Sequence, residues 1–315
     1  MVINNYILEN TYDIQLMNAF PNFKQQGFDI EAYNKRFRQS NIIITAFSSD
    51  ISYAEHWGCF SIKCAFNGNE YYKVSNRIYS VNDDGFLILN EGEYYSSHIF
   101  SNTKVESFTL NFTESIVNDV SCSLSCSDDM LIDNPSYFYK QQKDFVQKLY
   151  RHDSLVSPLL LKLRYLIKNF VNNKMLIEET YYSLLEKIFV LQQQVDEEIK
   201  QVKACKQSTQ KELYKRLHYV KDFIESCYMD DISLAQLATI GCLNSFYLLR
   251  EFKKYFKITP HQYLIQKRIT VAKQMLNNSK LCVSEICSQV GYNDVSSFNK
   301  LFKKHFLISP QNFRQ

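Results

Sequence analysis

The hydrophobic pattern of the chain changes along its length, and each change marks a different kind of structure. Between residues 41 and 112, short runs of β-branched and aromatic residues recur at spacings of roughly ten residues, separated by Asn, Asp and Gly, which is typical of a β-sandwich or barrel. Ser75 and Asn76 lie between two such runs and predict a hairpin turn. The predicted strands cover residues 42–47, 57–65, 70–74, 77–81, 85–90, 94–100 and 105–112.

From residue 135 the apolar positions recur every three or four residues, which is the period of an amphipathic helix. Two apolar stripes, at residues 159–170 and 184–202, predict two helices that form a hairpin. Two interpretations of the second stripe stay open: it covers the β domain, or it pairs with a second copy of the chain as a dimer contact. The dimer contact would use Leu184, Ile188, Leu191 and Val195. The polar segment 206–210 predicts a domain boundary.

The last third of the chain contains an internal repeat. Residues 252–260 return, with few changes, as residues 302–310. A short amphipathic segment and a turn precede each copy, so the repeated unit is a helix, a tight turn and a basic amphipathic helix. A longer helix over residues 261–276 separates the two units, and another over residues 211–228 precedes them. The turn of the second unit is one residue longer than that of the first.

Capping residues indicate where the helices of the repeat begin. Ser233 followed by Gln236 predicts a capping box at the first short helix. Asn244 and Asp294 predict the N-caps of the two basic helices. Pro260 ends the first basic helix, because the residue before a proline avoids the helical region.

The composition is that of an ordinary globular protein, with 45% apolar and 22% charged residues. No apolar run approaches the ~20 residues of a membrane span, and the N-terminus shows no export signal. The nine cysteines are scattered, so we expect reduced thiols in a cytoplasmic protein. The charge is unevenly placed: residues 211–315 carry 16 Lys and Arg against 8 Asp and Glu, which predicts a polyanionic partner for this part alone.

A basic helix after a tight turn is the geometry that places a helix in the major groove of DNA. The motifs of the repeat lie at residues 233–238, 252–254, 259–260, 263–269, 275–276, 286–287, 290–294, 297–304 and 308–314. Through these motifs, residues 212–314 closely resemble the DNA-binding domain of the AraC/XylS family of bacterial transcription regulators. Three residues depart from the pattern: Cys242 stands where the second unit has Gly291, Cys287 replaces a usual alanine, and Leu249 occupies a position that is often polar. We therefore expect the first unit to read bases less specifically than the second.

The resemblance implies which side chains face DNA. In the first unit they are Asn244, Ser245, Phe246, Leu249 and Arg250. In the second unit they are Asp294, Val295, Ser296, Ser297, Asn299 and Lys300. Arg250 and Lys300 can donate to guanine, and Asn299 can pair with adenine. The side chains expected at phosphates are Lys253, Lys254, Lys303 and Lys304.

The order of strands and turns over residues 40–115 is similar to that of a cupin-type jelly roll. Metal-binding cupins carry a His-x-His pair, which this sequence lacks, so we expect no metal, no cofactor and no catalytic residue. A jelly roll without a metal leaves space between its sheets for a small molecule. The candidate residues of this pocket are Trp57, Tyr95 and His98.

These patterns predict an α+β protein in three parts: a cupin-like ligand-sensing jelly roll at residues 1–135, a helical hairpin at 136–206, and an all-helical domain with two helix-turn-helix units at 211–315. The expected function is a cytoplasmic, sequence-specific transcription regulator that responds to a small-molecule effector. Its expected partners are promoter DNA, RNA polymerase and a second copy of the chain, with no membrane.

Three alternatives stay open. A cupin-type metalloenzyme joined to a DNA-binding domain would need clustered metal ligands, and the six histidines show no paired spacing. A ligand-independent regulator would respond to a protein partner instead. The spacings of Cys59 and Cys64, and of Cys122 and Cys126, suggest zinc binding or a thiol acceptor in DNA repair, but the surrounding sequence has no other feature of either.

Overall fold

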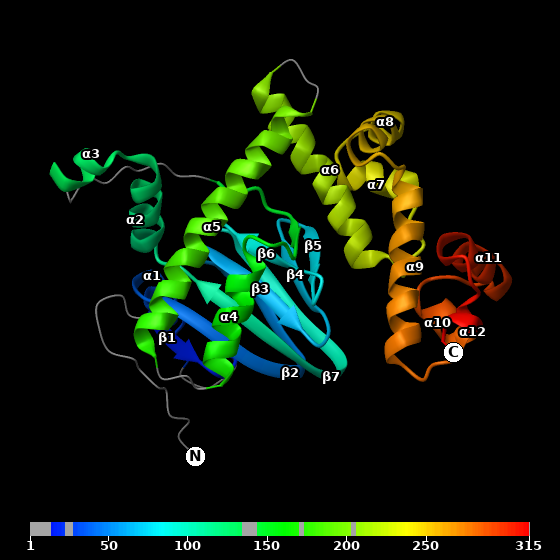
Figure 1. Ribbon diagram of the computed structural model, residues 1–315, viewed down its shortest axis with the longest axis horizontal. Coiled ribbons are helices and arrows are strands. Elements are labelled where there is room, and N and C mark those ends of the chain that lie inside the picture. The colour runs from blue at the N-terminus through cyan, green and yellow to red at the C-terminus, as the bar shows by residue number, and fades with distance from the viewer. Residues whose placement is uncertain (1–13, 23–27, 134–143, 170–172, 203–205, 315) are drawn as a thin grey trace. The chain divides into compact units, whose positions relative to one another are not determined.

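The computed structural model describes residues 14–22, 28–133, 144–169, 173–202 and 206–314 (Figure 1). The chain divides into two compact units, Met1–Lys203 and Ala204–Gln315. This division lies a few residues before the predicted boundary. The polar segment expected to be a linker forms the first turn of helix α6 (Gln207–Cys227) instead.

The first unit is built on a sheet centred on the long strand β7 (Tyr94–Asn111). Strand β2 (Asn41–Trp57) runs antiparallel along one side of β7, while β4 (Glu70–Val74) and β3 (Ser61–Phe66) pair with the two halves of its other side. The other strands of the described chain are β1 (Ile14–Met17), β5 (Arg77–Val81), β6 (Gly85–Leu89) and β8 (Leu149–Arg151). Since these strands connect into one sheet, the structure establishes a β-sheet domain and leaves the jelly-roll arrangement as a proposal.

Two strand predictions are wrong in their boundaries. Residues 94–100 and 105–112 are parts of one strand, because a shift of register opposite β2 accommodates the polar residues between them without ending the strand. The predicted strand at residues 57–65 is divided after Trp57. There Gly58 lies against the ring of Tyr95, and an added Cβ would be 2.7 Å from that ring.

Helices α4 (Ser157–Lys168) and α5 (Lys174–Lys200) pack on each other and cover one face of the sheet (Figure 1). Arg164 of α4 donates to both carboxylate oxygens of the buried Glu106 on β7, at 2.9 and 2.6 Å. The unit itself buries the apolar stripe of α5, namely Leu184, Ile188, Leu191 and Val195. The prediction of a dimer contact through these side chains is therefore wrong, because they belong to the core.

The sequence missed three helices in the part predicted to be a jelly roll. They are α1 (Ile30–Gln39), α2 (Glu114–Ser125) and α3 (Asp128–Asp133). Asp29 caps α1 and Thr113 caps α2, so local capping signals were present. The helical start predicted near residue 135 lies outside the described residues.

The second unit is helical throughout its described residues and contains both copies of the repeat. After α6 come α7 (Leu234–Ile240), α8 (Ser245–Phe256), α9 (Pro260–Asn278), α10 (Val283–Gln289), α11 (Val295–Phe306) and α12 (Pro310–Phe313). At the predicted capping box the Ser233 hydroxyl accepts from the Gln236 N–H. A reciprocal capping box is present at Thr259 and Gln262, at the start of α9.

Helix α9 connects the two helix-turn-helix units mechanically as well as in sequence. Its Arg268 donates to the carbonyl oxygens of Tyr228 and Asp230, in the loop that leads to α7, at 2.7 and 2.8 Å. The same guanidinium lies over the ring of Tyr292, after α10, at 5.2 Å. One side chain thus contacts the frame of both units.

Candidate nucleic-acid interface

The two helix-turn-helix units form their turns with equivalent hydrogen bonds. In the first unit the Leu243 N–H donates to the Ala238 oxygen at 2.9 Å, and in the second the Tyr292 N–H donates to the Cys287 oxygen at 3.0 Å. Both bonds span five residues and close the C-terminus of the short helix. The turns therefore superimpose in hydrogen-bond pattern, and this fixes which residues of the two units correspond.

Cys242 and Gly291 occupy the same place in the two turns, and both have left-handed backbone, with φ of 48° and 83°. From there the helix N-cap is two residues away in the first unit, at Asn244, and three away in the second, at Asp294. The prediction that the second turn is one residue longer is confirmed, and the additional residue is Asn293.

The N-cap side chains of the two basic helices are engaged with the backbone. The Asn244 side chain accepts from the Tyr247 N–H at 2.7 Å. Asp294 accepts from the N–H groups of Ser296 and Ser297, and hydrogen bonds from these serines lower the pKa of its carboxyl. Asn244 and Asp294 were also candidates for facing DNA, and the contacts in the structure are those of helix capping.

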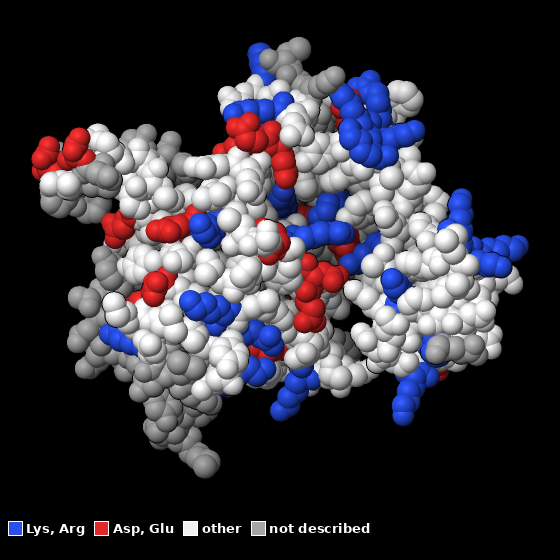
Figure 2. All heavy atoms as spheres, in the orientation of Figure 1, with Lys and Arg blue, Asp and Glu red and all other residues white. Residues whose placement is uncertain are grey.

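We call α8 and α11 the reading helices. On α8, Phe246, Arg250 and Lys253 follow one another at helical spacing on the exposed face, and the ring of Phe246 is 76% exposed. The equivalent exposed residues of α11 are Ser296, Lys300 and Lys303. Figure 2 shows basic side chains gathered over both reading helices.

The remaining candidates divide by exposure. Leu249 and Asn299 hold equivalent positions and are half-buried, and the Asn299 Oδ1 atom has no hydrogen-bond partner among the described residues. Ser245 is also half-buried. The fully exposed candidates that complete the set are Val295, Ser297, Lys254 and Lys304.

A buried acid, which the sequence did not indicate, organises the basic face of α8. Glu251 points inward, yet its Oε1 accepts from Arg250 Nε at 2.9 Å and its Oε2 accepts from Lys254 Nζ at 3.3 Å. The Arg250 guanidinium also lies 4.9 Å from the centre of the Tyr247 ring. Glu251 thus holds two of the predicted DNA contacts in place.

Comparison with known proteins agrees with this geometry. A family model described as a helix-turn-helix domain matches residues 237–315. An uncharacterized HTH-type transcriptional regulator of Escherichia coli is 38% identical over 93 residues, which are 30% of this chain and 31% of that protein. The second unit is an AraC/XylS-type DNA-binding domain.

Two further similarities lie in or extend beyond the AraC/XylS-type domain. The lactose operon transcription activator of Staphylococcus xylosus is 30% identical over 160 residues, which are 50% of this chain and 53% of that protein. The C-terminal domain of a two-component response regulator from Fusobacterium nucleatum has a TM-score of 0.30 and 39% identity, covering 30% of this chain and 94% of that domain. The chain spans about a third to a half of the length of the relatives named above.

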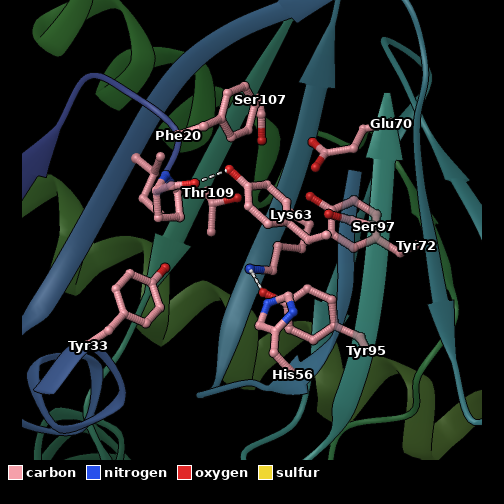
Figure 3. Close-up of a pocket in the computed structure, with 13 residues that line it drawn as sticks. Phe20, Tyr33, His56, Lys63, Glu70, Tyr72, Tyr95, Ser97, Ser107 and Thr109 are labelled. Carbon is pink, nitrogen blue, oxygen red and sulfur yellow. Dashed lines mark hydrogen bonds between the residues drawn. The ribbon is translucent and has the colours of Figure 1, made fainter. Parts of the chain in front are cut away.

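The first unit holds a cavity of about 400 Å³ (Figure 3). Tyr95 lines it as predicted, and Trp57 lines an adjoining cavity of about 320 Å³. The assignment of His98 is wrong. It lies on the outer face of β7, stacked on Tyr71 with ring centres 5.1 Å apart.

The chemically distinctive residues of the cavity were missed by sequence reasoning. They are Lys63 on β3, Glu70 on β4 and His56 on β2. Lys63 and Glu70 are 4% and 3% exposed, and the Lys63 Nζ donates to the Tyr95 hydroxyl at 3.0 Å. Burial lowers the pKa of Lys63 to about 8 and raises that of the Glu70 carboxyl.

The thiol and metal alternatives gain no site from the structure. The described residues contain no group of three or more His, Cys, Asp or Glu placed to hold a metal. Cys59 donates to Asn111 within the core, while the Sγ atoms of Cys122 and Cys126 on α2 lie 3.5 Å apart. In the part of the chain that is described, no helix is long and apolar enough to cross a membrane.

Proposed function

We propose that this protein is a cytoplasmic transcription regulator that reads two adjacent major-groove segments of promoter DNA and responds to a small molecule held in its first unit. The observation that carries the proposal is the match between exposed residues of the reading helices. Arg250 corresponds to Lys300 and Lys253 to Lys303 on helices that follow equivalent turns. Such helices enter neighbouring major grooves about 34 Å apart, one turn of B-DNA.

Within this proposal, Arg250 and Lys300 donate to base edges and the lysines that follow them contact phosphates. The half-buried Leu249 and the exposed Phe246 make the first reading helix more apolar than the second, where Asn299 and Ser296 correspond to them. RNA polymerase is the partner on which a regulator at a promoter acts. A homodimer would need a surface other than the buried stripe of α5.

The test is footprinting of the full chain on genomic DNA fragments, with Arg250→Ala and Lys300→Ala beside the wild type. Each substitution should abolish the preference at its own half of the site, by about 1–3 kcal/mol for each base contact. Lys253→Ala is the matched control, and it should weaken all sequences equally and reduce the salt dependence of binding by about one phosphate contact. An unchanged preference in both base-contact variants would contradict the assignment.

A further inference from the structure

The cavity of the first unit contains two oppositely charged side chains that do not neutralise each other. Lys63 and Glu70 come from the adjacent strands β3 and β4 and line the same space (Figure 3). No ion pair within 4 Å joins them, although both are more than nine-tenths buried. Buried charges are costly unless each has an opposite charge and hydrogen bonds, so the empty cavity leaves both side chains incompletely compensated.

The hydrogen bonds of the two groups show what each one lacks. Lys63 Nζ has three protons, and the Tyr95 hydroxyl accepts one of them. The hydroxyls of Ser107, Tyr72 and Ser97 interact with the Glu70 carboxyl. Even so, the Glu70 Oε2 atom is buried without a hydrogen-bond partner among the described residues. The site therefore offers unused donors at Lys63 and an unused acceptor at Glu70.

We infer that the cavity binds a small zwitterion, an amino acid whose carboxylate pairs with Lys63 and whose ammonium pairs with Glu70. The inference rests on the proposed function, since it names the class of effector that the first unit senses. A cavity of about 400 Å³ is at the small end of ligand pockets, which range over about 300–1,000 Å³. The rings of Tyr95, Tyr72 and Phe20 complete the lining and suit a short carbon chain.

Other ligand classes leave one of the two charges uncompensated. A monocarboxylate would satisfy Lys63 and bring a second negative charge beside Glu70. A monoamine would satisfy Glu70 and add a positive charge beside Lys63. A neutral polyol can hydrogen-bond to both groups, but it carries no charge to compensate theirs at low dielectric. His56 does not alter this balance, because burial lowers the pKa of its ring and its Nδ1 donates to the Ala54 oxygen at 2.9 Å.

The experiment is isothermal titration calorimetry of the full chain with a series of probes. The probes are glycine, β-alanine, 4-aminobutyrate, 5-aminopentanoate and the twenty protein amino acids, each beside a carboxylate and an amine of the same length, with glycerol and erythritol as polyols. At least one zwitterion should bind saturably, and its matched acid and amine should bind at least tenfold more weakly. Equal binding of a matched acid, amine or polyol overturns the inference. So does the absence of binding by every zwitterion at 10 mM, on the order of the weakest specific affinities.

Two variants locate the bound zwitterion. Lys63→Met and Glu70→Gln keep the size of each side chain and remove its charge, and each should weaken binding by at least about tenfold. Lys73→Met and Glu55→Gln are matched controls on exposed positions of β4 and β2, and they should bind as the wild type does. Unchanged affinity in the first two variants, with folding confirmed by circular dichroism, would overturn the assignment.

The DNA affinity of the same samples separates this inference from the proposed function. A zwitterion that binds through Lys63 and Glu70 and changes the affinity for DNA supports both. A zwitterion that binds in this way and leaves the DNA affinity unchanged supports the cavity assignment and contradicts the proposed response to an effector. The comparison of wild-type probe affinities does not depend on the variants, so the inference can fail even if a variant does not fold.

Discussion

Arg250 donates to its immediate neighbour Glu251, so the leading basic side chain of the first reading helix is bound to a buried acid on the same helix. Neighbours in a helix normally point in different directions. Here the long arginine side chain folds back along α8, over the ring of Tyr247. The direction of Arg250 is thus set before DNA arrives, and its loss of freedom on binding is reduced.

Glu251→Gln should separate affinity from specificity. The substitution removes the negative charge that holds Arg250 and Lys254, so the affinity for random DNA should rise. The preference for the target should fall by as much as the ~1–3 kcal/mol of one base contact. Fluorescence anisotropy with target and random duplexes over a range of salt measures both. Glu212→Gln, which removes an acid from an exposed ion pair on α6, should change neither quantity. A Glu251 variant that behaves like this control would contradict the positioning role.

Two phenylalanines of the second unit should respond oppositely to truncation. Phe302 is fully buried in the core of the second helix-turn-helix unit, so Phe302→Ala should cost about 3–5 kcal/mol of unfolding free energy. The exposed Phe246 should lose no more than about 0.5 kcal/mol on the same change. Phe246→Ala should instead weaken binding to the target DNA. Urea unfolding and anisotropy on both variants provide the comparison, and equal destabilisation of the two would be the contrary result.

The C-caps of both reading helices have left-handed backbone without glycine. Lys257 and Leu307 have φ of 66° and 65°, and Leu307 is 83% exposed. Left-handed backbone costs a residue with a Cβ about 1–2 kcal/mol, so Leu307→Gly should stabilise the unit by up to about 1 kcal/mol. His305→Gly, two residues earlier within the helix, should destabilise it by about 1 kcal/mol. The sign of the change in urea midpoint decides, and destabilisation by both glycines would refute the argument.

Stability of the second unit should depend on Glu225 and on pH. Burial by itself would raise the pKa of this carboxyl, but the charges of Lys267 and Lys221 and hydrogen bonds from Lys267 and Tyr263 lower it to about 2. A carboxyl with a lowered pKa in the folded state stabilises that state above its unfolded pKa, near 4.5, and the stabilisation is lost as the pH falls toward 2. It amounts to roughly 3 kcal/mol.

Glu225→Gln should therefore reduce stability at pH 7 and flatten its decline between pH 5 and pH 2. The loss at pH 7 should reach about 3–5 kcal/mol, because Lys267 remains buried without its partner. Urea unfolding followed by far-ultraviolet circular dichroism measures this at each pH. The single tryptophan, Trp57, reports on the first unit by fluorescence and should show no change. A variant with the slope of the wild type would contradict the ion-pair account.

The repeat made the second unit predictable from sequence. Its short helices, the N-caps at Asn244 and Asp294 and the longer second turn all follow from local signals that the structure reproduces. Glu251 was not predicted, because an acid among basic residues on a helix looks like an ordinary exposed residue. Its burial follows from the packing of α8, which sequence spacing alone does not give.

The cavity was harder to predict, although one error was avoidable. Tyr95 and His98 are separated by three positions, so on one strand they must face opposite sides of the sheet. Lys63 was not detectable in this way, because every residue of β3 is buried and the usual alternation of polar and apolar residues is absent. The sequence predicts where the strands lie, and the pairing of β7 with three other strands decides which side chains meet.

The contacts of Arg268 set a rule for the length of the DNA site. Since this side chain ties the loop before α7 to the turn after α10, the two reading helices cannot rotate independently about the DNA axis. Each base pair inserted between the two half-sites turns the second by about 34° relative to the first. Base changes in that spacer should therefore be tolerated, whereas a single insertion or deletion should move one half-site off the face of the helix that the protein contacts.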